Sequence, residues 1–327
     1  MRRETFDRLF PALKGELSAS GPMIAADHLA FLLNEPPVRA LRLDQVCRSG
    51  ELLAEGLQKA QRLYQSDFII VFSDVSVEAE ALGVKLEYLP GRNPQPVRHL
   101  PWEEVRVVDM ASRGRLPELF GAARTCRERF GGDFPIFFSM KDPFSLAAMA
   151  VGTEPFLEKL VLEPEVALGL LEICRENQLG LIKVILSEGF IPFIGAPIAS
   201  GGLIGAKSFE RFALPYLRPL FDQAEKAGSF RCLHICGEIG MLAKELASLN
   251  LDLLSFEDWH AEMWPLMPNT ISMGFVPTDL FQYGDTKLMR EAVNRCKSVM
   301  PAPFVLSTGC DLPAKAKPEL VQTMMRL

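Results

Sequence analysis

Eight short apolar segments recur along this sequence, and stretches with helical periodicity lie between them. The segments begin near residues 22, 68, 134, 190, 230, 252, 270 and 303. Short apolar runs bounded by turn residues are typical of buried strands, whereas longer amphipathic stretches are typical of helices. The alternation predicts an α/β fold with parallel strands, namely a (β/α)8 TIM barrel. A doubly wound sheet is the alternative, because the spacing of the segments is uneven.

The length of 327 residues would suit two average domains, but barrels of this type commonly place more residues in one unit. We therefore expect a single domain over residues 1–327 that begins with an amphipathic helix at 3–14. An excursion at about 83–112 has no sustained period and is expected to contain a small strand pair. Further helices are predicted at 44–65, 116–130, 143–162, 164–187, 207–227, 239–249, 260–266, 285–300 and 316–327.

Charge and composition argue against several classes of protein. The formal net charge is −6, whereas binding of nucleic acid needs a basic surface. Seven cysteines scattered along the chain do not suggest a disulfide framework, so a reducing cytoplasm is expected. No apolar segment typical of a signal peptide follows the first four residues. The uncharged stretch 189–206 is interrupted by prolines and glycines, so we expect no membrane span.

Polar side chains follow six of the predicted strands. Active sites of (β/α)8 barrels lie at the C-terminal ends of the strands, where the connecting loops begin. The side chains expected at this end are Asp27, His28, Ser73, Asp74, Lys141, Asp142, His234, Cys236, Glu257, Asp258 and Cys310.

One of these strand ends has the residue types and the spacing of a metal site. In a strand, His234 and Cys236 point to the same face, and Gly237 then lets the chain turn. Cys310, just past another strand, supplies a third ligand. Three nitrogen or sulfur ligands with an open fourth position are typical of catalytic zinc. Cys232 shares this face but lies one pleat deeper, so we expect a buried thiol there.

Several stretches resemble the uroporphyrinogen decarboxylase superfamily. They are Phe72-Ser73-Asp74, Ala81-Leu82-Gly83-Val84, Ala199-Ser200-Gly201-Gly202-Leu203-Ile204 and Arg211-Phe212-Ala213-Leu214-Pro215-Tyr216-Leu217. Leu233-His234-Ile235-Cys236-Gly237 and Leu306-Ser307-Thr308-Gly309-Cys310-Asp311-Leu312-Pro313 are similar to its corrinoid-dependent methyltransferase branch, typified by methylcobalamin:coenzyme M methyltransferases. The resemblance covers about residues 3–325. It implies a (β/α)8 barrel with zinc bound by His234, Cys236 and Cys310.

The sequence departs from the decarboxylases of this superfamily at several positions, one of which is a stretch that binds their substrate. They carry an arginine-rich stretch after the first strand, where this chain reads Asp27-His28-Leu29-Ala30-Phe31-Leu32. They have a histidine where Cys310 stands. Asp74 matches their tetrapyrrole-binding aspartate, and Gly274-Phe275-Val276-Pro277 replaces a more usual Gly-Asn.

The resemblance implies a zinc-dependent methyltransferase that moves a methyl group between a corrinoid and a small thiol. Methylcobalamin or a corrinoid-binding protein would carry the methyl group. Asp74 and Glu257 are the candidate catalytic residues, which would complete the metal site at rest or orient the substrate. Gly201 and Gly202 are predicted to allow close approach of the planar corrinoid.

The sequence is also compatible with three alternatives to this function. The first is a methyltransferase that demethylates a methoxylated substrate, for which Phe144, Trp259, Trp264 and Phe275 would line an aromatic pocket. The second is a uroporphyrinogen decarboxylase, which the missing arginines and Cys310 disfavour. The third is a zinc scaffold or corrinoid-binding partner without catalysis, in which a fourth protein ligand would close the metal site.

Overall fold

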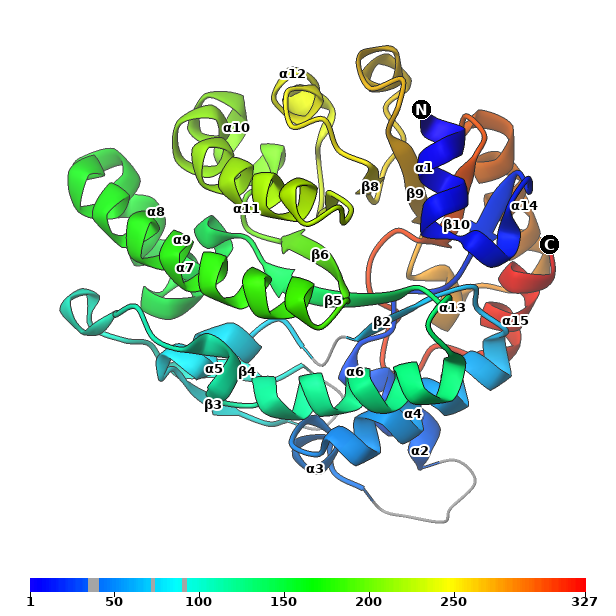
Figure 1. Cartoon of the computed structure of the whole chain (residues 1–327), viewed down its shortest axis with the longest axis horizontal. Coiled ribbons are helices and arrows are strands. Elements are labelled where there is room, and N and C mark those ends of the chain that lie inside the picture. Colours follow the sequence, from blue (N-terminus) through cyan, green and yellow to red (C-terminus); the bar gives the residue numbers. More distant parts are fainter. Residues whose placement is uncertain (35–40, 72–73, 90–92) are drawn as a thin grey trace.

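An eight-stranded parallel sheet forms the centre of the molecule, with helices around it (Figure 1). The computed structural model describes residues 1–34, 41–71, 74–89 and 93–327. The strands are β1 (Ser18–Ser20), β2 (Ile69–Val71), β5 (Ile136–Lys141), β6 (Ile191–Ala196), β7 (Cys232–Ile235), β8 (Leu253–Ser255), β9 (Ile271–Val276) and β10 (Phe304–Thr308).

The order of the strands in the sheet follows their order in the sequence. Hydrogen bonds connect β2 to β5 and then each strand to the next as far as β10, which pairs with β1. Every one of these pairs is parallel. The remaining neighbours, β1 and β2, meet through Asp67, whose backbone N–H donates to the carbonyl of Ser20 at 2.9 Å. The predicted (β/α)8 barrel is confirmed.

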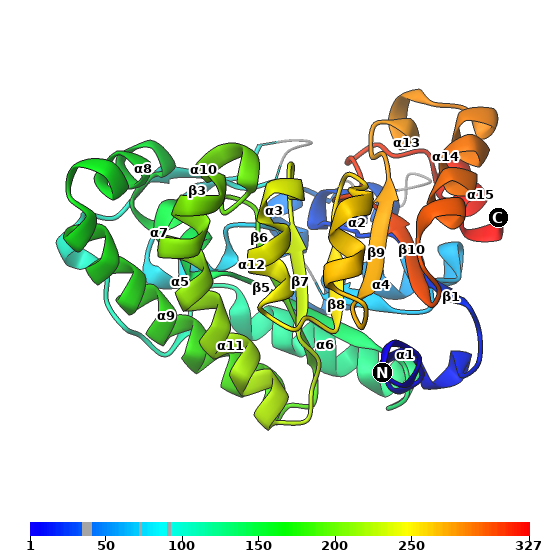
Figure 2. The same cartoon turned by 90° about the horizontal axis from the view of Figure 1, so that it is seen from above.

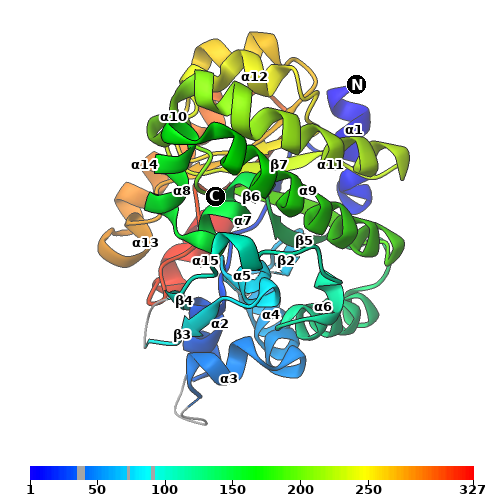
Figure 3. The same cartoon turned by 90° about the vertical axis from the view of Figure 1, so that its left-hand side faces the viewer.

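Helices cover the outside of the barrel, and Figure 3 shows α7, α8, α9 and α11 along one side. The α-helices are α1 (Arg2–Leu9), α2 (Ala26–Leu33), α3 (Leu43–Cys47), α4 (Gly50–Tyr64), α5 (Val77–Leu82), α6 (Leu116–Phe130), α7 (Pro143–Val151), α8 (Thr153–Leu162), α9 (Pro164–Ser187), α10 (Gly201–Ser208), α11 (Leu214–Lys226), α12 (Ala243–Ala247), α13 (Leu280–Tyr283), α14 (Thr286–Val299) and α15 (Pro318–Arg326). A π-helical turn, Phe209–Ala213, joins α10 to α11. Short 3-10 helices are Pro11–Leu13, Trp102–Glu104, Met110–Ser112, Gly240–Leu242 and Ala261–Leu266.

The expected first strand near residues 22–28 is wrong. The strand lies earlier, at β1, and Gly21 makes the last backbone bond to β10, donating to Leu306 at 3.1 Å. Pro22 follows and has no N–H, so it cannot extend the ladder. Asp27 and His28 consequently lie in the first turn of α2 instead of at a strand end.

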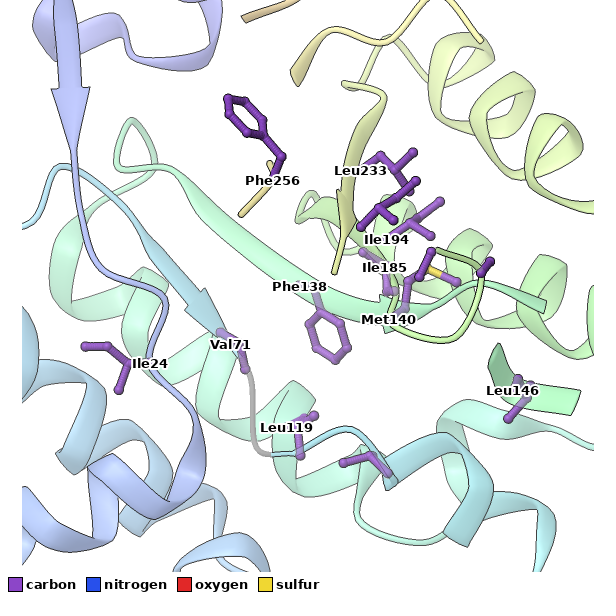
Figure 4. Packing of buried hydrophobic residues seen from close by; sticks show 14 of the residues in the cluster. Ile24, Val71, Leu119, Phe138, Met140, Leu146, Ile185, Ile194, Leu233 and Phe256 are labelled. Atoms are coloured by element: carbon purple, nitrogen blue, oxygen red, sulfur yellow. The ribbon is translucent and has the colours of Figure 1, made fainter. Parts of the chain in front are cut away.

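Alternation along the strands gives the barrel two separate packing faces. Outward side chains such as Phe138, Ile194 and Leu233 are buried against the helices, as Figure 4 shows together with Ile185 of α9. Inward side chains form a second core with the N-terminal helix. Its members are Phe6, Leu9, Phe10, Ala19, Met23, Phe68, Ile70, Phe137, Phe193, Cys232, Leu253, Ile271, Met273 and Val305.

The N-terminal segment therefore closes one end of the barrel. Phe10 packs against Phe6 and Phe68, with ring centroids 5.0 and 6.2 Å apart. In Figure 2, α1 lies on the opposite side of the sheet from α10 and α13. The other end, where the strands finish, is left for the loops that carry the candidate site.

The expected strand pair within 83–112 is present as β3 (Lys85–Glu87) and β4 (Gln95–Arg98), which are antiparallel. Two of the 3-10 helices follow β4, and α6 then begins at Leu116. Within the part of the chain that the structure describes, we find no helix with the length and apolar character needed to cross a membrane.

Candidate metal centre

Three strands of the barrel bring four potential metal ligands together. His234 is on β7 and Cys236 immediately follows that strand, while Glu257 follows β8 and Cys310 follows β10. One ligand atom from each of these four side chains lies within 4.8 Å of those of the other three. All four residues are among those expected from the sequence at the strand ends, and the barrel explains how positions more than 70 residues apart meet.

The distances among the nitrogen and sulfur atoms suit a tetrahedral ion. His234 Nε2 is 3.2 Å from Cys236 Sγ and 3.8 Å from Cys310 Sγ, and the two sulfur atoms are 3.9 Å apart. Zinc bonds of about 2.3 Å to sulfur and about 2.0 Å to nitrogen place tetrahedral ligands roughly 3.5 to 3.8 Å apart. The residues present therefore fit zinc.

The orientation of His234 is fixed from behind by Ser255. The hydroxyl of Ser255 is 3.1 Å from His234 Nδ1, and it donates in turn to Met23 Sδ at 3.5 Å. In this chain of bonds Nδ1–H is the donor, which leaves the Nε2 lone pair for a metal. Neither Ser255 nor Met23 was predicted, although Ser255 shares the inward face of β8 with Leu253 by simple alternation.

Glu257 lies at the edge of the cluster with one oxygen already bound. Its Oε1 accepts a hydrogen bond from the backbone N–H of Gly237 at 3.0 Å. Gly309 also packs closely, because a Cβ at that position would lie 3.1 Å from Glu257 Cα. These contacts hold the loops after β7, β8 and β10 against one another.

The thiol of Cys310 has its pKa raised above the ordinary value. The hydrogen bond with Cys236 is the largest cause, and burial adds to it. Both effects favour the protonated thiol, whereas a cation between the two sulfur atoms would favour the thiolates. A bound cation would therefore favour the thiolate form of Cys310.

Two cavities lie along the segment that follows β10, and three residues of the cluster, His234, Cys236 and Cys310, line the smaller one. The smaller, of about 70 Å³, is mostly apolar and is lined by Met23, Ile24, Ile70, Val75, Ser139, Lys141, Phe193, Gly195, Pro197, His234, Cys236, Cys310 and Asp311. The larger, of about 590 Å³, is lined by Asp27, Ala30, Phe31, Asn34, Leu41, Arg42, Leu43, Asp44, Tyr88, Leu89, Ala314 and Lys315. The segment 310–315 contributes side chains to both.

Asp74 lies elsewhere, in a buried ion pair. Arg115 donates to both of its oxygens, and the N–H and hydroxyl of Ser76 donate to Oδ1 at 2.8 and 2.6 Å. Arg115 also pairs with Glu80. Asp74 is absent from the four-residue cluster and from the lining of the smaller cavity. A catalytic role for Asp74 stays a prediction; Ser73 and Phe72 of the same motif lie outside the described residues.

Gly201 and Gly202 lie at the start of α10, against the loop after β7. A Cβ on Gly201 would come within 2.7 Å of the Met241 side chain and 2.8 Å of the Glu238 carbonyl oxygen. Gly202 is exposed. Gly201 therefore allows two loops of this chain to approach each other, and corrinoid contact by either glycine stays a prediction.

Three of the four aromatic residues predicted near strand ends, Trp259, Trp264 and Phe275, pack on one another. Trp259 and Trp264 stack at 5.2 Å, and Trp259 also stacks on Phe275 at 5.9 Å. Phe144 is fully buried. None of these four lines the smaller cavity beside the cluster.

The remaining five cysteines lie outside the four-residue cluster. Cys232 is buried in the inner core beneath His234, and Cys47, Cys126, Cys174 and Cys296 are buried in helices. All seven cysteines, each within the described residues, are free thiols.

Comparison with known proteins now places the chain in a family. The sequence profile of uroporphyrinogen decarboxylase (URO-D) matches residues 35–327. The chain belongs to the uroporphyrinogen decarboxylase family. A solved structure described as a methyltransferase from Methanosarcina mazei has the same fold, with a TM-score of 0.83 and 21% sequence identity over 98% of this chain and 97% of that one.

Within the uroporphyrinogen decarboxylase family, this chain is similar to methyltransferases as well as to decarboxylases. It is 30% identical over 188 residues to a methylated-thiol–coenzyme M methyltransferase of Methanosarcina mazei (56% of this chain, 50% of that protein). It is 29% identical over 172 residues to a methylcobamide:CoM methyltransferase of Methanosarcina acetivorans (50% of each). Uroporphyrinogen decarboxylase of Rattus norvegicus is 26% identical over 233 residues (65% of this chain, 62% of that protein). The matches to the two methyltransferases span about half the length of those proteins.

Proposed function

We propose that this protein is a zinc-dependent methyltransferase that transfers a methyl group between a corrinoid and a small thiol. The observation that carries the proposal is the cluster of one imidazole and two thiols at ligand distances, at the end of a barrel where active sites of this fold lie. The similarity to methylcobamide:CoM methyltransferases supports the corrinoid and the thiol as the reacting partners.

His234, Cys236 and Cys310 would hold the zinc through Nε2 and the two Sγ atoms. Bound zinc would supply a site at which a substrate thiol loses its proton near neutral pH. Ser255 keeps His234 in the required tautomer. Glu257, held through Oε1 by Gly237, would occupy the fourth position at rest or orient the thiol.

In the proposed direction, the thiol sulfur forms a bond to the methyl carbon and the cobalt–carbon bond breaks. Its electron pair stays on cobalt, which passes from Co(III) to Co(I), and the thiol proton leaves to solvent. The small apolar cavity suits a short thiol and a methyl group, whereas the larger open cavity has room for part of the corrinoid. A corrinoid-binding protein, as the carrier, is the expected partner.

The test combines metal analysis with a transfer assay under reducing conditions. We expect about one zinc per chain, lost in His234→Ala and Cys310→Ala while the circular dichroism spectrum is retained. The zinc form should demethylate methylcobalamin in the presence of a small thiol, with release of Co(I) followed by absorption. Wild-type protein that stays metal-free when zinc is supplied would contradict the proposal.

The same assay separates the alternatives. Methyl transfer from a methoxylated compound to Co(I), without transfer to thiols, would assign the demethylating reaction. Release of carbon dioxide from uroporphyrinogen would assign a decarboxylase. Zinc binding with none of these activities would assign a scaffold.

A further inference from the structure

Met23, in the segment between β1 and α2, forms backbone hydrogen bonds on both sides of Cys310. Its N–H donates to Thr308 Oγ1 at 3.0 Å, and its carbonyl accepts from the N–H of Leu312 at 2.9 Å. Thr308 lies two positions before Cys310, and Leu312 lies two positions after it. Both flanks of the third ligand are thus tied to one residue from the other end of the chain.

The side chain of Met23 reaches the first ligand. Its Sδ accepts from Ser255 Oγ at 3.5 Å, and that oxygen is 3.1 Å from His234 Nδ1. Met23 is 5% exposed, and it lines the small cavity beside His234 and Cys310. One residue therefore connects the imidazole of β7 with the thiol that follows β10.

His28, which follows Met23 in the sequence, also contacts the loop after Cys310. Its Nδ1 lies 3.2 Å from the carbonyl oxygen of Ala314, and its Nε2 lies 2.8 Å from the hydroxyl of Tyr64. The ring is completely buried and stacks on Phe31 and Tyr64. Nδ1–H donating to Ala314 and the Tyr64 hydroxyl donating to Nε2 satisfy both nitrogens.

We propose that Met23 is the positioning residue of the metal centre, and that its bonds to Thr308 and Leu312 hold Cys310 at ligand distance from His234. This inference rests on the proposed metal function. Loss of the bond to Thr308 leaves a buried N–H unpaired and frees the start of the Cys310 loop, so its main effect should be on ligation by that thiol.

Thr308→Val tests the proposal, since valine keeps the shape of threonine and removes the acceptor for Met23 N–H. Thr270→Val is the matched control: Thr270 is also buried, and its hydroxyl donates to the carbonyl of Leu251 at 2.8 Å, just before β9 at the opposite end of the strands. The measurements are zinc affinity by chelator competition and the thiolate-to-metal absorption of the Co²⁺ form, beside thermal unfolding of the metal-free proteins.

We expect Thr308→Val to lose about tenfold or more in zinc affinity and to show a weaker thiolate-to-cobalt absorption. Thr270→Val should keep wild-type zinc affinity and cobalt absorption, even if its melting temperature falls as far as that of Thr308→Val. Thr308→Ser, which retains the hydroxyl, should restore both properties. If Thr308→Val does not fold, Thr308→Ala against Thr308→Ser gives the same comparison.

Equal affinity and absorption in Thr308→Val and the wild type would overturn the positioning role and leave the proposed function standing. Equal losses in Thr308→Val and Thr270→Val would also overturn it, because they would reflect general destabilisation. A wild-type protein that binds neither Zn²⁺ nor Co²⁺ would overturn both proposals.

Discussion

The two ring nitrogens of His234 have different partners. Nδ1 faces the Ser255 hydroxyl, and Nε2 faces the sulfur atoms of Cys236 and Cys310. A histidine ligand whose second nitrogen is hydrogen-bonded keeps both its tautomer and its ring plane.

Ser255→Ala should therefore weaken zinc binding by about 10- to 100-fold, because the imidazole loses the acceptor that fixes its tautomer. The matched control is Ser272→Ala, since Ser272 is as fully buried on the neighbouring strand and its hydroxyl has no hydrogen-bond partner among the described residues. Chelator competition measures both affinities. Equal zinc affinity in the two variants would show that Ser255 does not orient His234.

A second single residue, His28, makes the stability of the protein depend on pH. Burial lowers its pKa from 6.5 to about 4 in the folded protein. A histidine whose folded pKa is depressed binds its proton more readily when unfolded, so acid favours unfolding. The stabilising contribution of neutral His28 is complete above pH 6.5 and is lost progressively as the pH falls toward 4.

The contribution of His28 between pH 7 and pH 5 is about 2 kcal/mol. In metal-free protein, His28→Gln should reduce the fall in unfolding free energy over this range by about that amount. Urea titrations at the two pH values measure it. His99→Gln, which removes an exposed imidazole, is the control. An identical fall in wild type and His28→Gln would contradict the assignment.

At the scale of elements, two consecutive glycines of α10 have different surroundings. Gly201 is buried against the loop after β7, where its N–H also donates to the carbonyl of Glu238 at 2.9 Å. Gly202 is exposed, and a Cβ there would meet only Glu238 Cβ at 3.4 Å. The two positions share a helix but not a packing constraint.

Gly201→Ala should destabilise the protein by about 1–3 kcal/mol, because its methyl group would overlap the backbone of Glu238 and the side chain of Met241. Gly202→Ala should be neutral or stabilise by up to about 1 kcal/mol, since alanine favours helix. Chemical unfolding measures both. A higher KM for methylcobalamin in Gly202→Ala would support the predicted corrinoid contact, and an unchanged KM would count against it.

The bounds of helices and strands could be predicted wherever local sequence signals determine them. α6 and α9 begin and end at the expected residues because their apolar spacing, prolines and flanking residues are local signals. The first strand could not be placed, since three residues of β1 carry little pattern and the next apolar run begins with Pro22. That run became the connection containing Met23.

Some residues of the candidate site could likewise be predicted from the sequence, whereas some of its contacts could not. His234, Cys236, Glu257 and Cys310 were predictable because ligand chemistry and strand ends are visible in a sequence. The partner of Asp74 was not, because Arg115 lies 41 positions away and meets it only in the folded protein. Burial of that carboxylate beside a guanidinium is a property of tertiary packing, so no local sequence pattern predicts it.

At the scale of the whole molecule, stability and chemistry lie at opposite ends of the barrel. Phe6, Leu9 and Phe10 complete the inner core at the end where the strands begin, while the ligands follow the strand ends. The apolar interior between them includes Phe137, Phe193 and Cys232.

Phe10→Ala should therefore cost about 3–5 kcal/mol of unfolding free energy without changing zinc affinity. Phe10 is 1% exposed, whereas Tyr283 is 79% exposed, so Tyr283→Ala is the control and should stay within about 0.5 kcal/mol of wild type. Unfolding in urea and chelator competition give the two quantities. A parallel loss of stability and zinc affinity would show that the two ends are coupled.

The pairing of β1 with β10 also sets an order of events during synthesis of the protein. The bond between Met23 and Thr308 joins residues 285 positions apart. At about 5–20 residues per second, a ribosome needs roughly 14 to 57 s to cover that interval. Until then the first strand has no partner on that side, and His234 and Cys236 wait for Cys310. The three proposed zinc ligands can thus come together only after the ribosome has translated the chain through Cys310.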